Sequence, residues 1–123
     1  MNEQLQEKFA AIINLQGYEY RLWHYQASHS VLTIRAYQPA NPGHNIHIIF
    51  EPVAYMQMPI SWKHGDIRLG TQIEHVQITS QIASVNEFIA EIFTLFVAEP
   101  LNSGPIYVLC HSAYVEYDVE PLY

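Results

Sequence analysis

Three successive stretches of the chain alternate in polarity with a period of two residues, and this pattern constrains the fold most. The stretches span residues 18–26, 31–38 and 45–51, and they are rich in aromatic and β-branched residues. Such alternation is typical of strands with one buried face. The turn sequences Ala27–Ser30 and Pro39–Gly43 separate the stretches. The pattern therefore predicts an antiparallel meander of three strands.

A helix is predicted before this meander, over residues 3–16. Its apolar residues recur at a spacing of three to four, which places them on one helical face. Gly17 follows the last turn and can adopt the left-handed conformation that ends a helix. The apolar face consists of Leu5, Phe9, Ile12 and Ile13.

A second helix is predicted from the capping box Ser84-Val-Asn-Glu87, in which Ser and Glu stand three residues apart. This helix is expected to run to about Ala98 and to end before Pro100. Apolar side chains cover most of its circumference, so we expect the sheet or a second subunit to surround it. These side chains are Val85, Phe88, Ile89, Ile92, Phe93, Leu95 and Phe96.

The remaining segments complete the expected sheet. Pro52 and Pro59 argue against a central strand in region 53–72, which is predicted to hold an edge strand and loops. Residues 73–79 alternate and are predicted to form a strand. The last hairpin is predicted from strands 106–110 and 114–119 around a His111-Ser112 turn. The predicted fold class is α+β, and residues 1–123 are expected to form a single domain. Its sheet is expected to be largely antiparallel, with about five to seven strands and with two helices packed on one face.

Charge excludes several function classes. The chain has 5 Lys and Arg against 12 Asp and Glu, a net charge of −7, and its cations form no run. We therefore expect no binding to nucleic acid or to an anionic membrane, whereas a basic protein partner would suit this charge. No apolar stretch reaches the roughly 18–20 residues that span a bilayer. The polar segment Met1–Lys8 is unlike a signal peptide, so a cytoplasmic location is expected.

The cysteine and histidine pattern specifies no metal centre, cofactor or catalytic group. Cys110 is the single cysteine, and a buried structural role is expected for it because cysteine is among the most buried residue types. Cys110 and His111 would point to opposite faces of a strand, so they are not expected to act as nucleophile and base. His44 and His47 also stand on opposite faces of a strand, and no His-Glu-x-x-His pattern occurs. We therefore expect neither a metal nor a cofactor.

The register of the first hairpin decides which side chains share a face. A turn of two or four residues gathers the apolar residues on one face, which is why we favour it. That core face would hold Trp23, Tyr25, Leu32, Ile34, Ala36, Ile46, Ile48 and Phe50. The outer face would hold Tyr20, Leu22, His24, Thr33, Arg35, Tyr37, His47, Ile49 and Glu51. A turn of three or five residues would instead place Trp23 beside Arg35 on the outer face and turn His24 inward.

The favoured function is a small, acidic, non-enzymatic interaction module. A homodimer is expected, because the second helix and the aromatic strands offer more apolar surface than a 14.2 kDa monomer easily hides. A partner would contact the outer face. The candidate binding residues are Tyr20, His24, Arg35, Tyr37, His47, Glu51 and Trp62.

The alternative is a small enzyme or ligand-binding protein with a pocket at the sheet edge. Its lid would be Pro52–Gly70, and its rim would be formed by His47, Glu51, His64 and Asp66. A catalytic outer face would instead use His24 or His47 to transfer a proton and Glu51 to orient the histidine, because imidazole titrates near neutral pH. Two rim residues within hydrogen-bond reach in a concave pocket would favour this alternative.

Overall fold

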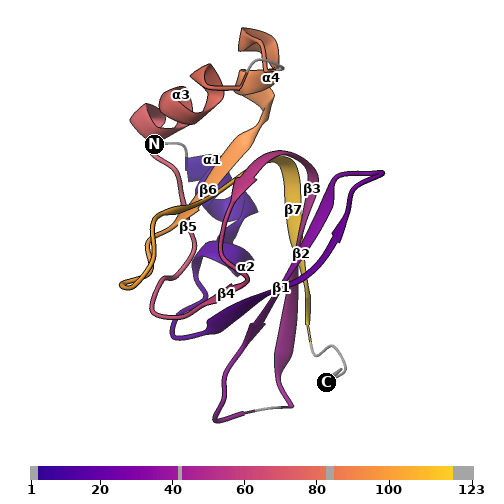
Figure 1. The fold of residues 1–123 in the computed structure, drawn as a ribbon, viewed down its shortest axis with the longest axis vertical. Coiled ribbons are helices and arrows are strands. Elements are labelled where there is room, and N and C mark those ends of the chain that lie inside the picture. The colour runs from indigo at the N-terminus through magenta and orange to yellow at the C-terminus, as the bar shows by residue number, and fades with distance from the viewer. Residues whose placement is uncertain (1–2, 42, 83–84, 118–123) are drawn as a thin grey trace.

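The computed structural model describes residues 3–41, 43–82 and 85–117. Seven strands form one antiparallel sheet in the order β4–β1–β2–β3–β7–β6–β5 (Figure 1). The predicted α+β fold class with a largely antiparallel sheet is therefore confirmed. The strands are β1 Glu19–Gln26, β2 Val31–Tyr37, β3 Asn45–Gln57, β4 Ser61–Trp62, β5 Arg68–Leu69, β6 Thr94–Ala98 and β7 Ile106–Tyr117, and the helices are α1 Glu3–Lys8, α2 Ala10–Ile13, α3 Gln72–Ser80 and α4 Glu87–Ile92.

The predicted meander is confirmed, but its register changes within β1. Tyr20 pairs with Ala36 and Leu22 with Ile34, after which the register shifts and His24 pairs with Thr33. Trp23 is the extra residue of this β-bulge. A bulge re-aims the side chains on either side of it. Neither uniform register is therefore correct.

The bulge corrects the expected faces of the first strand. Tyr20 and Leu22 share the core face with their partners on β2, although both were expected on the outer face. Trp23 lies beside Arg35 on the outer face instead of in the core. His24 stays on the outer face, as expected, and is exposed.

Strand β3 is a central strand of 13 residues that continues through Pro52. This corrects the prediction that Pro52 excludes a central strand. The pairing of β3 with β2 ends at Phe50, opposite Leu32. Pro52 stands just beyond that last pair, so β2 needs no N–H from it.

The main core lies on the face of the sheet that α1 and α2 cover. Phe96 from β6 packs edge-on against Phe9 at 5.1 Å and against Phe50 at 5.3 Å between ring centroids. All three rings are fully buried. The predicted first helix is thus confirmed in position, as two short helices that meet at Phe9.

The second predicted helix and the strand before it are corrected. Residues 72–80 form α3 rather than a strand, and only Glu87–Ile92 is helical in the region expected to be one long helix. Residues 94–98 form β6, which is buried on both faces. A strand buried on both faces is apolar throughout, which explains the resemblance of this segment to a surrounded helix. Ser84 lies outside the described residues.

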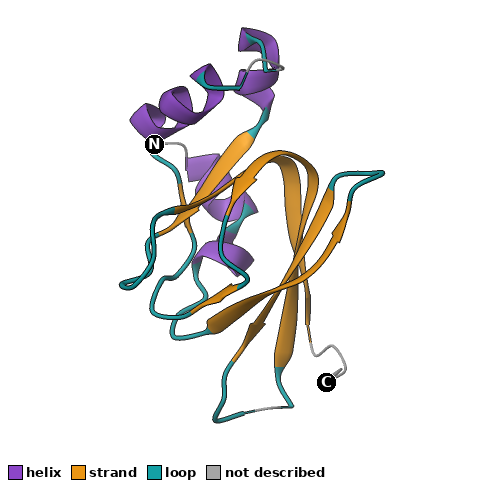
Figure 2. Cartoon of the chain, in the orientation of Figure 1, coloured by secondary structure: helices purple, strands orange, loops and turns teal. Residues whose placement is uncertain are grey.

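Helix α3 packs against the opposite face of β6 from α2. Leu95 and Val97 contact Ile78 in a second cluster, whereas Phe96 and Ala98 belong to the main core. The two helical layers therefore lie on different faces, not on one. Figure 2 shows α3 and α4 together near the start of β6.

The final hairpin is also corrected, because residues 106–117 form the single long strand β7. His111 and Ser112 continue the strand, and Ser112 pairs with Glu51 of β3. The sequence has no Gly or Pro between Ile106 and Tyr117 to break it. Residues 118 and 119 of the predicted hairpin lie outside the described residues.

Candidate functional site

The outer sheet face holds a packed cluster of Trp23, Arg35 and His47. Arg35 Nε–H donates a hydrogen bond of 3.1 Å to His47 Nε2. The Arg35 Cζ atom lies 3.7 Å from the Trp23 ring centroid, within the range of a cation–π contact. The Arg35 side chain is buried. Its guanidinium therefore stabilises the sheet face and offers little surface to a ligand.

His47 is held in its neutral form by this arrangement. Burial lowers its pKa below the ordinary value of 6.5, and the charge of Arg35 lowers it further, while Glu116 opposes both effects. Because Nε2 accepts a hydrogen bond from Arg35, the neutral ring carries its hydrogen on Nδ1. His47 is thus a structural acceptor between β2 and β3.

Two of the predicted contact residues lie in the core. Tyr20 and Trp62 are buried and stack with their ring centroids 4.8 Å apart. Trp62 Nε1–H donates to the Gly65 carbonyl oxygen at 2.8 Å. Burial raises the pKa of Tyr20, and the nearby carboxylate of Asp66 raises it further. The prediction that Tyr20 lies on the outer face is wrong.

The expected His and Glu rim is not brought together. His47 and Glu51 lie on β3, whereas His64 and Asp66 follow β4, three strand spacings away. Strands stand about 4.8 Å apart, so β3 and β4 are separated by about 14 Å. The predicted membership of the edge pocket is therefore wrong. Asp66 instead accepts a hydrogen bond from the Gly17 amide at 3.3 Å.

Cys110 is buried, as expected. Burial raises the pKa of its thiol to about 12, which keeps the sulfur protonated at neutral pH. His111, the next residue, is exposed. The pair therefore forms no nucleophile and base.

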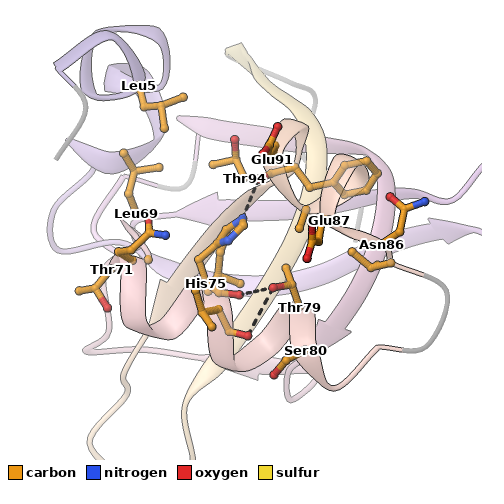
Figure 3. A pocket seen from close by; sticks show the side chains of 17 residues that line it. Leu5, Leu69, Thr71, His75, Thr79, Ser80, Asn86, Glu87, Glu91 and Thr94 are labelled. Atoms are coloured by element: carbon orange, nitrogen blue, oxygen red, sulfur yellow. Dashed lines mark hydrogen bonds between the residues drawn. The ribbon is translucent and has the colours of Figure 1, made fainter.

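A groove of about 860 Å³ lies between α3, α4 and β6, and we name it the α3–α4 groove (Figure 3). Leu5 of α1 closes one end of it. Apolar side chains form much of the lining, and polar side chains come from both helices. The lining residues are Leu5, Leu69, Gly70, Thr71, Gln72, His75, Val76, Thr79, Ser80, Val85, Asn86, Glu87, Ala90, Glu91, Phe93, Thr94 and Leu95.

Local hydrogen bonds fix α3 as one wall of the groove. The Thr71 hydroxyl accepts from the Glu74 amide at 3.1 Å, and the Glu74 carboxylate accepts from the Thr71 amide at 2.8 Å. His75 Nε2 lies 2.9 Å from the Phe93 carbonyl oxygen, which ties the helix to the start of β6. The Thr79 hydroxyl donates to the His75 carbonyl at 2.8 Å (Figure 3). These polar groups hold the wall in place.

An ion pair outside the groove reinforces the same wall. The Arg68 guanidinium donates two hydrogen bonds to the Glu74 carboxylate, at 2.8 and 2.9 Å, and another to Glu99. The pairing holds the pKa of Glu74 at about 2. Such bidentate geometry is the strongest form of this contact.

The groove also carries an uneven charge. Glu87 and Glu91 stand one helical turn apart on α4 and are exposed, and no Lys or Arg is among the 17 lining residues. Exposed apolar side chains continue the surface beyond the groove on both helices. These are Ile73, Phe88 and Ile92.

The α3–α4 groove does not follow from the alternation of residues 73–79, which predicts a strand where the structure has α3. The sequence nevertheless contains a signal for the start of this helix. Thr71-Gln-Ile-Glu74 has the spacing of a capping box, and the structure forms both of its hydrogen bonds.

No three His, Cys, Asp or Glu side chains of 3–41, 43–82 and 85–117 lie where they could hold a metal ion. No helix in these ranges is long and apolar enough to cross a membrane. Comparison of the chain with family models, with curated proteins and with solved structures finds no match.

Proposed function

We propose that this protein is a non-enzymatic interaction module whose α3–α4 groove binds a basic, amphipathic segment of another protein. The observation that carries the proposal is the composition of the groove. Its lining combines apolar residues such as Val76 and Leu95 with the carboxylates of Glu87 and Glu91, and contains no cation. An amphipathic helix laid in such a groove buries its apolar face and directs its cations to the rim.

Charge supports a basic partner in two ways. The net charge of −7 attracts cations from a distance and speeds encounter. At contact, Glu87 and Glu91 supply acceptors for Lys or Arg side chains. Neither carboxylate has an ion pair within the described part of the chain.

A homodimer is the second candidate, and the exposed apolar side chains of Ile73 and Phe88 favour it. A second copy would also bury these exposed apolar side chains. It would, however, bring a second Glu87 and Glu91 toward the first pair if the same surfaces met. Like charges oppose such an interface. A basic partner therefore satisfies the groove better.

The alternative of a small enzyme has less support at this site. The groove volume of about 860 Å³ suits a small molecule as well as a peptide. However, His75, the histidine of the lining, is engaged with the backbone carbonyl oxygen of Phe93. This contact stabilises the local structure, so we favour binding over chemistry.

Titration of the protein with a fluorescent peptide of leucine and lysine, spaced as an amphipathic helix, tests the proposal. The matched probe replaces every lysine with glutamate. We expect binding of the basic peptide alone, weakened about tenfold by the double variant Glu87→Gln/Glu91→Gln and by added salt. The control variant Glu3→Gln/Glu7→Gln removes two exposed carboxylates of α1 and should bind as the unmodified protein does.

Three outcomes would contradict the proposal. Equal binding of both peptides would remove the charge argument, and binding of neither would remove the function. A stable dimer in light scattering that Phe88→Asp converts to a monomer would identify a second copy as the occupant instead.

The proposal keeps two further expectations from the sequence. A cytoplasmic location is consistent with the single thiol of Cys110, since reducing compartments retain free cysteines. Nucleic acid is not an expected partner, because 5 cations face 12 carboxylates. A gel-shift titration with duplex DNA and single-stranded RNA checks the second point.

A further inference from the structure

We propose that a second, smaller pocket at the β4 edge of the sheet binds a small zwitterion of amino-acid to dipeptide size. This edge pocket has a volume of about 330 Å³. Small-molecule sites begin near this size, so the volume suits a small ligand. The lining residues are Glu19, Tyr37, Ser61, Trp62, Lys63, Pro100, Asn102 and Ser103.

The charges of the pocket favour a ligand that carries both signs. Glu19 and Lys63 directly adjoin the cross-strand pair Tyr20 and Trp62, and both line the pocket. Yet the two side chains form no ion pair with each other within the described residues. A carboxylate and an ammonium thus line one pocket without neutralising each other directly.

A zwitterion satisfies both charges at once. Its ammonium group would donate to the Glu19 carboxylate, and its carboxylate would accept from Lys63. The hydroxyl of Ser61 and the amide of Asn102 add neutral partners at the wall. Tyr37 donates only a long hydrogen bond of 3.5 Å to Glu19, which leaves acceptor capacity on that carboxylate.

One wall of the pocket, at Trp62 and Pro100, is packed before any ligand arrives, whereas Ser61, Lys63, Asn102 and Ser103 are exposed. Trp62 is buried and hydrogen-bonded to the Gly65 carbonyl oxygen. Gly65 in turn lies against Pro100, so closely that a Cβ atom on Gly65 would stand 2.8 Å from the Pro100 nitrogen. The loop after β6 is therefore pressed onto the loop after β4. A preformed site loses less conformational entropy on binding.

Nuclear magnetic resonance titration with three matched probes tests the proposal. The probes are L-alanyl-L-alanine, its N-acetyl derivative and its C-terminal amide, which carry both charges, the negative charge alone and the positive charge alone. We expect the dipeptide to shift the amide signals of Ser61 and Lys63. It should bind about tenfold more tightly than either blocked probe.

Variants separate the roles of the two charges. Lys63→Gln should abolish the advantage of the dipeptide over the amide, and Glu19→Gln should abolish its advantage over the N-acetyl probe. Lys8→Gln and Glu7→Gln remove the same charges from α1 and should leave all three affinities unchanged.

The proposal is overturned if the three probes bind equally, or if none shifts the Ser61 and Lys63 signals at millimolar concentration. It is also overturned if Lys63→Gln and Lys8→Gln weaken binding alike, since the effect would then follow net charge. None of these results bears on the α3–α4 groove, which shares no lining residue with the edge pocket.

Discussion

Arg35 and His47 are cross-strand partners on β2 and β3, and the Arg35 Nε–H donates to His47 Nε2 at 3.1 Å. Protonation of His47 would remove this acceptor and place a second cation beside the guanidinium. Glu116, the cross-strand partner of His47 on β7, opposes this effect by raising the pKa of His47. The pair therefore makes the outer sheet face sensitive to pH.

Stability is expected to fall as the pH drops below about 6.5, because the pKa of His47 is lower in the folded chain than its ordinary value. Folding favours the neutral form of His47, and the resulting stabilisation of the fold is fully present above pH 6.5. It is lost as the pH falls through the lower pKa of His47 in the folded chain. Urea unfolding between about pH 7 and pH 5 measures this loss. His47→Gln should flatten the profile, whereas His24→Gln, on the same face but exposed, should not. Identical profiles for the two variants would contradict the assignment.

A second pH effect is expected in acid from Glu74. Its pKa of about 2, well below the ordinary 4.5, means that the charged carboxylate stabilises the fold above pH 4.5 and that this stabilisation is lost as the pH falls toward 2. Glu74→Gln keeps a residue suited to the capping box but removes the charge that pairs with Arg68. Its unfolding free energy should therefore depend less on pH in this range than that of Glu3→Gln. An equal dependence in both variants would assign the acid loss to other carboxylates.

Truncation of Phe96 should destabilise the protein far more than truncation of Phe88. Phe96→Ala should cost about 3–5 kcal/mol, because it opens a cavity between the rings of Phe9 and Phe50. Phe88 is 70% exposed, so Phe88→Ala should change the unfolding free energy by less than about 0.5 kcal/mol. Chemical denaturation of both variants measures the difference. A comparable loss in Phe88→Ala would show that α4 is buried in solution.

A pair of glycine variants tests the contact that fixes the edge pocket. Gly65→Ala should destabilise the protein by about 1–3 kcal/mol, because the new Cβ meets the backbone of Pro100 at 2.8 Å. Gly104→Ala places its Cβ in open space and should be neutral or slightly stabilising. Thermal unfolding compares the two. If both variants unfold alike, the loops after β4 and β6 are not in contact.

The periodicity of apolar residues predicted those parts of the fold in which one face of a helix or strand is buried and the other is exposed to solvent. The first hairpin and the apolar face around Phe9 and Ile12 are of this kind, because alternation or helical spacing then reveals the element. Residues 94–98 are buried on both faces, so no period remains to distinguish a strand from a helix. The prediction of one helix over this segment failed for that reason.

The candidate site depended on features that periodicity does not encode. The bulge at Trp23 places Tyr20 in the core, and its extra residue reverses the phase of the alternation. Because Leu22 and Trp23 are both large and apolar, the sequence does not show where the phase changes. The groove required α3, whose capping box at Thr71 was visible but was outweighed by the apparent alternation of residues 73–79. The edge pocket joins β1, β4 and the loop before β7, which are distant in sequence. Only the topology brings them together.

The two outermost strands are short, and this affects how readily the sheet edges of separate molecules can pair at high protein concentration. β4 and β5 contain two residues each, so these outermost strands present only short rows of unpaired amides and carbonyls. Beyond β4, the uncovered stretch of β1 begins at the Trp23 bulge, which bends the strand away from a flat template. Beyond β6, residues 112–117 of β7 pair with β3 alone within the described part of the chain. An added strand would therefore find only a short template at β4 and at β5, which disfavours edge-to-edge association at these two strands.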